Sequence, residues 1–156
     1  METTLILLNE AQTQAIGSAL APLLLPPLTC FFKGELGAGK TSLIRAILRA
    51  KGIIGAIKSP SYTLIEPYEI AHQVIYHMDL YRLEDEDQLE WLGIRDYFHQ
   101  NALCLIEWPE RAVKGLPKAD VICELTYYDE GRAITLSADT DVGEKIIKTF
   151  HEGRSK

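Results

Sequence analysis

Hydrophobic residues recur along this chain in two patterns, one typical of β-strands and one typical of α-helices. Short apolar or alternating runs bounded by turn residues predict strands over residues 3–8, 28–32, 63–70, 73–79, 102–106, 121–128 and 132–137. Apolar residues at helical spacing predict helices over residues 10–24, 42–50, 84–92 and 141–152. Strands that alternate with helices in this way indicate an α/β protein.

Polar residues and glycines mark where several of these elements begin and end. Asn9 is a predicted N-cap for the first helix, with Gln12 in the capping-box position. Gly52 and Gly93 are placed to end the second and third helices. Tight turns join the third strand to the fourth and the sixth to the seventh, so we expect a mixed sheet rather than a wholly parallel one.

Length, composition and charge narrow the class of protein. The chain has 156 residues, of which 47% are hydrophobic and 24% are charged. These values suit one globular domain over residues 1–156 with a sizeable core. The net charge of −6 argues against a protein whose main task is to grip nucleic acid through its phosphates. A net negative charge is still compatible with a protein that acts on RNA indirectly, through a partner protein.

The cysteines and the longest apolar segment bear on location. Cys30, Cys104 and Cys123 lie far apart in apolar, strand-like runs, which predicts buried free thiols in a reducing compartment. A zinc site would need clustered Cys or His residues. The apolar segment 15–32 contains three prolines and cannot form one membrane helix. No basic region precedes the first apolar stretch, so we expect a cytoplasmic protein without membrane association.

Residues 34–41 read Gly-Glu-Leu-Gly-Ala-Gly-Lys-Thr, which matches the phosphate-binding pattern G-x-x-x-x-G-K-[ST]. The match lies between a predicted strand and a predicted helix, the context that this motif requires. In such a loop, backbone N–H groups and the helix dipole hold phosphate oxygens. Lys40 is expected to reach the β- and γ-phosphates and the Thr41 hydroxyl to face Mg²⁺. The other predicted nucleotide contacts in this stretch are Gly37, Ala38, Gly39 and Ser42.

A phosphate loop needs an acidic partner for Mg²⁺, and two carboxylates lie at the ends of predicted strands. Glu107 follows four apolar residues, and Asp79 follows a run of five mostly apolar ones. The alternative for either residue is a carboxylate that caps a helix or pairs with an arginine. We expect both to serve the metal, with Glu107 closer to it.

The segment around Asp79 is dense in polar groups. Period-two spacing sends His77, Asp79 and Tyr81 to one face of an extended segment. For His77, a satisfied core residue and a functional residue are equally compatible with the pattern. Arg82 could contact a phosphate or form an ion pair with the acidic run 84–87. That run is predicted to be the solvated start of a helix, and the alternative is that it docks onto a basic partner surface.

Residues 59–63, Ser-Pro-Ser-Tyr-Thr, follow the phosphate-loop helix where related enzymes place a nucleotide-sensing segment. A simple turn into a strand explains the same residues equally well. The chain lacks the Asn-Lys-x-Asp motif of regulatory GTPases and the Leu-Ser-Gly-Gly-Gln motif of transporter ATPases. Its later arginines are scattered rather than gathered in a kinase-like lid.

Five motifs in order resemble the TsaE (YjeE) family of ATPases: the phosphate loop, then Lys-Ser-Pro-Ser-Tyr-Thr, His-Met-Asp-Leu-Tyr-Arg-Leu, Leu-Gly-Ile-Arg-Asp-Tyr and Ile-Glu-Trp-Pro-Glu. The resemblance spans about residues 7–150. It implies a P-loop NTPase-like three-layer sandwich whose central sheet is mixed and mainly parallel. It also implies a cytoplasmic, Mg²⁺-dependent ATP hydrolase that is slow alone and binds a complex of TsaB and TsaD. TsaD transfers a threonylcarbamoyl group to adenosine 37 of tRNAs that read codons starting with A.

Carried over by position, the resemblance assigns roles to individual residues. Lys40 and Thr41 are the phosphate and Mg²⁺ residues, and Glu107 is the strand-end metal carboxylate. Asp79 lies in the second acidic motif and is expected to bind the metal with Thr41 and Glu107. The expected catalytic residues are Lys40, Asp79 and Glu107. Trp108 is expected beside the nucleotide.

Weaker expectations concern the base and ribose of ATP. Glu10 and Arg132 are candidates for these contacts. Ser61 stands where the family more often has threonine, and its hydroxyl is retained.

Two other functions fit the phosphate loop. One is a free-standing kinase that acts on a small metabolite, and the other is a nucleotide-gated scaffold that barely hydrolyses ATP. A kinase would phosphorylate an acceptor alone, whereas an ATPase subunit would be slow alone and faster with its partners. A scaffold would stay slow in both conditions.

Overall fold

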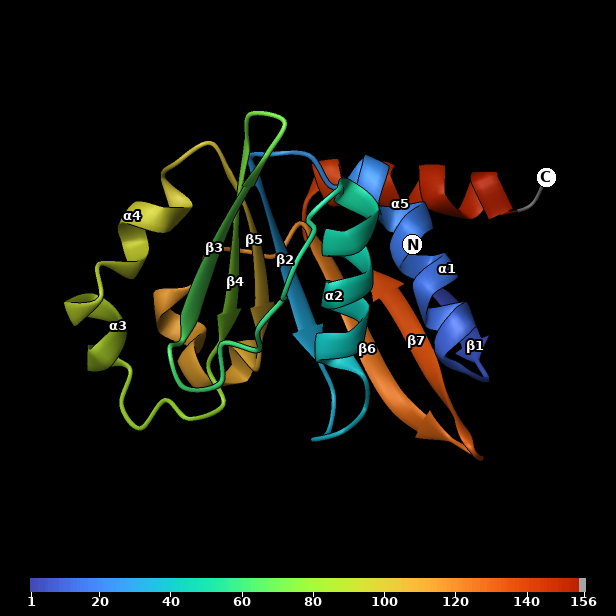
Figure 1. The fold of residues 1–156 in the computed structure, drawn as a ribbon, viewed down its shortest axis with the longest axis horizontal. Coiled ribbons are helices and arrows are strands. Elements are labelled where there is room, and N and C mark those ends of the chain that lie inside the picture. The colour runs from blue at the N-terminus through green and yellow to red at the C-terminus, as the bar shows by residue number, and fades with distance from the viewer. Residues whose placement is uncertain (155–156) are drawn as a thin grey trace.

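A single β-sheet forms the centre of the computed structural model, which describes residues 1–154, so the end of the predicted domain at Lys156 lies outside the described residues. Within them the sheet has seven strands in the order β1-β7-β6-β2-β5-β4-β3 (Figure 1). The strands are β1 Thr3–Leu7, β2 Leu28–Lys33, β3 Ile65–Ile70, β4 Gln73–Asp79, β5 Ala102–Glu107, β6 Val121–Tyr128 and β7 Gly131–Ser137.

The directions of the strands confirm the predicted mixed, mainly parallel sheet. Strands β6, β2, β5 and β4 pair in parallel, whereas β3, β7 and β1 join through antiparallel pairs. Only β3 and β7 therefore run against the rest of the described strands. Both belong to the hairpins that the turn residues predicted, since two parallel strands cannot be joined by so short a loop.

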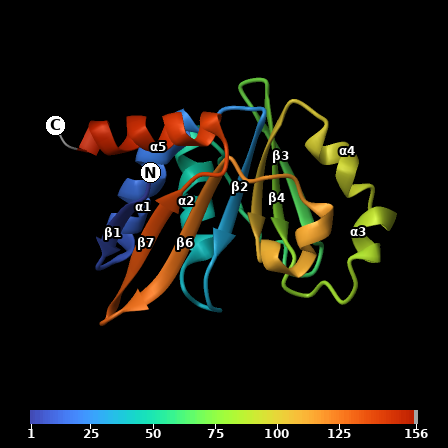
Figure 2. The same ribbon diagram turned by 180° about the vertical axis from the view of Figure 1, so that it is seen from behind.

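Helices cover both faces of the sheet, which confirms the three-layer α/β architecture. The helices α1 (Glu10–Leu20) and α2 (Lys40–Lys51) lie on one face (Figure 1). On the other face lie α5 (Asp141–Arg154) and the 3₁₀ segment η2 (Pro109–Gly115) (Figure 2). Two short helices flank the β3 end of the sheet, and a second 3₁₀ turn follows α1: α3 Asp87–Trp91, α4 Ile94–Phe98 and η1 Ala21–Leu23.

The first helix is shorter than predicted. The Asn9 carboxamide caps it by accepting a hydrogen bond from the backbone N–H of Gln12, at 3.0 Å. The Gln12 side chain, however, accepts from the N–H of Leu8, so the reciprocal capping box to Asn9 was wrong. The predicted end at residue 24 was also wrong, because Pro22 has no N–H and the last turn becomes the 3₁₀ segment η1.

The acidic region holds two short helices rather than the single predicted one. Its start at residue 84 was wrong, because the Asp85 carboxylate accepts from the N–H of Asp87 in a local turn. Gly93, with φ of 68°, ends α3 as expected but also begins α4, which the sequence did not predict. Strand β3 likewise starts two residues late, because Leu64 adopts φ of 69°, outside the β region.

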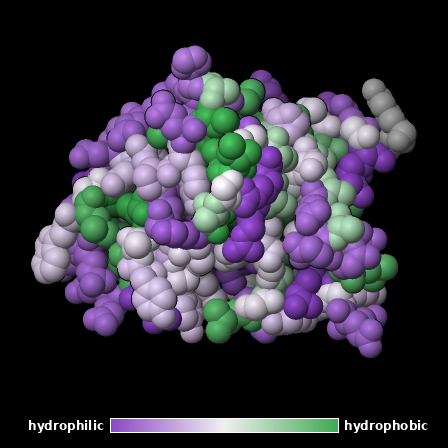
Figure 3. All heavy atoms as spheres, in the orientation of Figure 1, coloured by the Kyte–Doolittle hydropathy of each residue, from purple (hydrophilic) through white to green (hydrophobic). Residues whose placement is uncertain are grey.

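Burial of the cysteines agrees with the sequence. Cys30, Cys104 and Cys123 are buried and form no disulfide. Burial raises the pKa of the Cys104 and Cys123 thiols to about 12. Polar and apolar residues mix on the face shown in Figure 3, where the apolar ones form small groups. No helix within residues 1–154 has both the length and the apolar character needed to cross a bilayer.

The packing of α1 on α2 generates a prediction about stability. A Cβ atom on Gly17 of α1 would lie 2.5 Å from the Cβ of Ala46 on α2, so the two helices would have to separate. We expect Gly17→Ala to lower the free energy of unfolding by about 1–3 kcal/mol, the usual cost of overpacking. Gly153→Ala is the matched control because nothing lies within 4 Å of the added Cβ. Urea denaturation measures both, and equal stability of the two variants would contradict this packing.

Candidate nucleotide site

The phosphate loop connects β2 to α2 and has a backbone that requires glycine. Gly34 has φ of 146°, and a Cβ there would lie 2.3 Å from the carbonyl oxygen of Leu125. Gly39 has φ of 105° and stands directly before α2. No side chain among the described residues caps this helix end. Its first N–H groups and its positive dipole end are therefore available to an anion such as phosphate.

The β6–β7 hairpin supports the loop from the side. The Tyr127 hydroxyl donates to the Leu36 carbonyl at 2.9 Å, and the Arg132 guanidinium donates to the Gly37 carbonyl at 3.2 Å. The Arg132 guanidinium also stacks 4.2 Å above the Tyr127 ring. The sequence singled out Arg132 and missed Tyr127. Tyr127 shares a strand face with Leu125, and that alternation was the only local signal for it.

Lys40 is folded back onto its own loop. Its Nζ donates to the carbonyl oxygens of Gly34 and Glu35, at 2.5 and 2.9 Å. The ammonium also lies 4.3 Å from the centroid of the Trp108 ring, so Trp108 borders the loop. Burial lowers the pKa of Lys40, and the carboxylates around it, chiefly Glu107, act in the opposite direction.

Glu107 is the most connected carboxylate of the site. It ends β5, is 2% exposed, and accepts the Thr41 hydroxyl at 2.8 and 3.0 Å from its two oxygens. The Nε2 atom of His77 lies 2.7 Å from Glu107 Oε2. His77 therefore contacts the predicted metal carboxylate as well as being part of the core.

Asp79 lies beside Glu107 because β4 pairs with β5 in parallel and the two residues stand opposite each other. Its carboxylate accepts from the N–H of Tyr81 at 3.0 Å and from the Ser61 hydroxyl at 3.3 Å. Burial raises the pKa of Asp79, and the nearby charge of Glu107 adds to the rise. The parallel strands thus deliver two carboxylates to one edge of the sheet.

Of the two interpretations of segment 59–63, the structure confirms the turn, and the nucleotide-sensing role stays a prediction. The segment is a turn, in which the N–H of Leu64 donates to the Pro60 carbonyl at 2.8 Å. That turn also brings Ser61 to Asp79. Arg82 forms no ion pair with the acidic run 84–87 within the described residues, and its guanidinium stacks 4.3 Å above the Tyr62 ring. Contact of Arg82 with a phosphate stays a prediction.

Two hollows meet at the loop. One, of about 220 Å³, is lined by Thr41, Ser61, Asp79 and Glu107 among others. The second, of about 240 Å³, is lined by Glu10 and Arg132 among others. Both include Gly37, Gly39 and Ser42. The predicted metal residues therefore line one hollow, the predicted base or ribose residues line the other, and residues of the phosphate loop border both.

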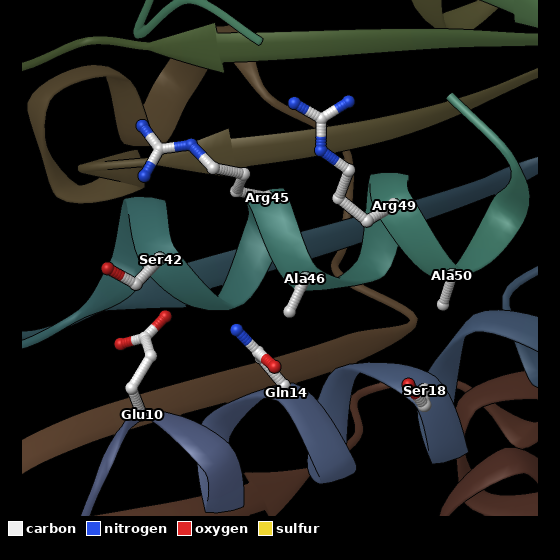
Figure 4. Close-up of a pocket in the computed structure, with 8 residues that line it drawn as sticks. All are labelled: Glu10, Gln14, Ser18, Ser42, Arg45, Ala46, Arg49 and Ala50. Atoms are coloured by element: carbon white, nitrogen blue, oxygen red, sulfur yellow. The ribbon is translucent and has the colours of Figure 1, made fainter. Parts of the chain in front are cut away.

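A larger groove, of about 440 Å³, runs between α1 and α2 and shares Glu10 and Ser42 with the second hollow. Glu10 points across this groove toward Ser42, whereas Arg45 and Arg49 extend away from α1 (Figure 4). Glu10 thus stands where the groove meets the phosphate loop. Ala38 is a fully buried residue of the loop, and its backbone N–H donates to the Glu35 carbonyl at 3.0 Å.

The donor set suits a hard cation that is shared with a phosphate ligand. Thr41 offers a hydroxyl, and Glu107 and Asp79 offer carboxylates, all in or beside the 220 Å³ hollow. Among residues 1–154 no cluster of three or more His, Cys, Asp or Glu side chains could hold a metal by itself. Mg²⁺ is commonly bound in this incomplete way, by one or two carboxylates with water and substrate phosphates.

Comparisons with known proteins agree on one family. The sequence model of that family, described as threonylcarbamoyl adenosine biosynthesis protein TsaE, matches residues 7–134. A protein of Haemophilus influenzae named tRNA threonylcarbamoyladenosine biosynthesis protein TsaE is 51% identical over 120 residues, covering 77% of this chain and 76% of its own. A Bacillus subtilis protein of the same name is 36% identical over 132 residues, covering 83% and 82%.

A solved structure is similar over nearly the whole fold. The crystal structure of Bacillus subtilis YdiB superposes with a TM-score of 0.85 at 26% sequence identity. The match covers 99% of this chain and 97% of the other. The overall fold is therefore shared with an experimentally determined structure.

The raised pKa of Asp79 generates a prediction about stability and pH. Because the folded state disfavours the charged carboxylate, Asp79→Asn should raise the melting temperature of the ligand-free protein at pH 7. The gain should shrink as the pH falls toward the ordinary aspartate range, where Asp79 is protonated in both folded and unfolded chains. Thermal unfolding between pH 4 and 8 measures it, with the exposed Asp96→Asn as control. A destabilised Asp79→Asn protein at pH 7 would contradict the assigned cause.

The contact between Lys40 and Trp108 generates a second prediction. A nucleotide that draws Lys40 onto its phosphates must change the surroundings of the Trp108 ring. Trp91 is 85% exposed on α3 and should sense nucleotide less. ATP or ADP should therefore change the fluorescence of Trp91→Phe, which keeps Trp108, more than that of Trp108→Phe. Equal changes in the two proteins would remove Trp108 from the site.

Proposed function

Because the chain belongs to the TsaE family of threonylcarbamoyl adenosine biosynthesis proteins, we propose that it binds and hydrolyses ATP with Mg²⁺ in support of tRNA modification. The product is threonylcarbamoyladenosine at position 37 of tRNAs that read codons starting with A. The transfer itself takes place on TsaD, in complex with TsaB, and hydrolysis by this chain supports repeated turnover.

The single observation that carries this proposal is the hydrogen bond from Thr41 to Glu107 at the N-terminus of α2, which no side chain among the described residues caps. Glycine-lined N–H groups hold the β- and γ-phosphates in this scheme, and Lys40 exchanges the loop carbonyls for phosphate oxygens. Thr41 and Glu107 would hold Mg²⁺, which would supply positive charge to the phosphates. Hydrolysis needs no covalent intermediate with the protein.

Asp79 serves the attacking water in this mechanism. Its carboxylate lines the same hollow as Thr41 and is oriented by the Tyr81 N–H and the Ser61 hydroxyl. It accepts a hydrogen bond from water, whose oxygen attacks the γ-phosphorus as the bond to ADP breaks. The raised pKa of Asp79 improves its ability to accept the proton that the water releases.

The other hollow fits the nucleoside of ATP. Glu10 and Arg132 line a different hollow from the carboxylates, and the loop residues that would hold the phosphates border both hollows. The Glu10 carboxylate can accept from a ribose hydroxyl or an amino group. Arg132 donates a hydrogen bond to the Gly37 carbonyl and so fixes the position of this hollow relative to the phosphate loop.

Exposed apolar side chains near the loop support the proposal that this chain binds a protein partner. Leu36 of the loop is 65% exposed, and Tyr62 of segment 59–63 is 82% exposed. Both adjoin groups that would contact the γ-phosphate, so the surface offered to TsaB and TsaD would differ between ATP and ADP states. The net charge of −6 disfavours direct binding of tRNA, which therefore reaches this chain only through its partners in the cytoplasm.

Two loop variants test the proposal in the assembled complex. Lys40→Ala removes the charge on the β- and γ-phosphates and should reduce ATP turnover with TsaB and TsaD to background. Thr41→Ala should weaken nucleotide binding in the presence of Mg²⁺ more than in its absence. Phosphate release and calorimetry measure these effects, with the exposed Lys148→Ala on α5 as the control.

The same assay separates the proposal from its rivals. Wild-type turnover should be slow for the isolated chain and faster with TsaB and TsaD. Wild-type ATPase activity in the Lys40→Ala complex would refute the assignment of the loop. Phosphorylation of a small acceptor by the isolated chain would favour a kinase, and a rate that stays slow with partners would favour a scaffold.

A further inference from the structure

His77 is a buried polar residue whose bonding is only half complete. Its side chain is 1% exposed, and Nε2 lies 2.7 Å from Glu107 Oε2. The other ring nitrogen, Nδ1, is buried and has no hydrogen-bond partner among the described residues. A histidine that merely filled the core would be expected to satisfy both nitrogens. Here the one available bond is directed at the site carboxylate.

The bonding pattern fixes the direction of this hydrogen bond. An ionised carboxylate can only accept, so the His77 ring donates through Nε2–H to Glu107. Nδ1 contributes no hydrogen bond to the surrounding core among the described residues. The ring's one hydrogen bond therefore serves to orient the Glu107 carboxylate.

The sheet holds both partners rigidly. His77 and Asp79 lie on one face of β4, and β4 pairs with β5, which ends in Glu107. Thr41 donates to the same carboxylate from the first turn of α2. The carboxylate is thus held from the sheet by His77 and from the loop helix by Thr41. Of these two donors, only Thr41 lines the 220 Å³ hollow.

We propose that His77 is the positioning residue for magnesium, acting through Glu107. By holding Oε2 from within the core, the imidazole keeps the carboxylate turned so that Oε1 and the Thr41 hydroxyl face the metal together. Such outer contacts to a ligand typically change metal affinity by about 10–100-fold. This inference rests on the proposed role of Glu107 at Mg²⁺.

Three substitutions at residue 77 separate positioning from packing. His77→Gln can place an amide N–H close to the position of Nε2, whereas His77→Asn places its amide near Nδ1, and His77→Leu has no donor. The probe is a fluorescent ADP analogue titrated into each protein, first with chelator and then with increasing Mg²⁺. Thermal unfolding of each ligand-free protein records the structural effect separately.

We expect His77→Leu and His77→Asn to raise the Mg²⁺ midpoint about tenfold or more, without changing affinity in chelator. His77→Gln should stay within about threefold of the wild type. Should His77→Leu fail to fold, the contrast between Gln and Asn gives the same test. An unchanged midpoint in His77→Leu and His77→Asn, a Gln variant as impaired as Asn, or equal losses with and without Mg²⁺ would overturn the inference.

Glu107→Gln distinguishes failure of this inference from failure of the proposed function. If Glu107→Gln raises the Mg²⁺ midpoint but the His77 variants do not, only the positioning role is wrong. If Glu107→Gln leaves the midpoint unchanged, the metal role of Glu107 fails and the role of His77 fails with it. A raised midpoint in Glu107→Gln, His77→Leu and His77→Asn, with rescue by Gln, supports both.

Discussion

The buried carboxylate of Glu107 is the group on which the rest of the site depends. It is 2% exposed, and its recorded side-chain partners are the Thr41 hydroxyl and the His77 ring. Removing a carboxylate from water costs several kcal/mol unless charge or hydrogen bonds compensate. The hydrogen bonds from these two side chains and the charge of the nearby Lys40 ammonium offset part of that cost, whereas the neighbouring Asp79 adds a second negative charge. The site is therefore arranged to favour a cation, and Mg²⁺ brought by a nucleotide would meet that need.

This arrangement results from parallel strands and from a loop after β2 that requires glycine at particular positions. Strands β2, β4 and β5 end at one edge of the sheet, so Asp79 and Glu107 emerge beside the loop that follows β2. The close approach of Gly34 to Leu125 lets the loop rest on β6. Tyr127 and the hairpin then hold the loop carbonyls. The positions of the catalytic candidates thus follow from backbone pairing more than from contacts between the candidates themselves.

Much of this could be predicted from the sequence because the signals were local. The phosphate loop, the strand-end carboxylates and the two hairpins each show in a few consecutive residues. Helix α4 was missed because its five residues carry too little periodicity, and Gly93 was taken only as a stop. The contact of Tyr127 with the loop joins residues 91 positions apart, and that of His77 with Glu107 joins residues 30 apart. No local pattern encodes such pairs, although strand pairing brings them together.

In this mechanism a metal bound with nucleotide would be held by Thr41 and Glu107. Crystals grown with a non-hydrolysable ATP analogue and Mn²⁺ in place of Mg²⁺ would locate the metal by its anomalous scattering. We expect one strong peak within coordinating distance of the Thr41 hydroxyl and of a phosphate oxygen, with Glu107 bound directly or through one water. A metal peak away from both Thr41 and Glu107, in a complex whose phosphates occupy the loop, would contradict the account.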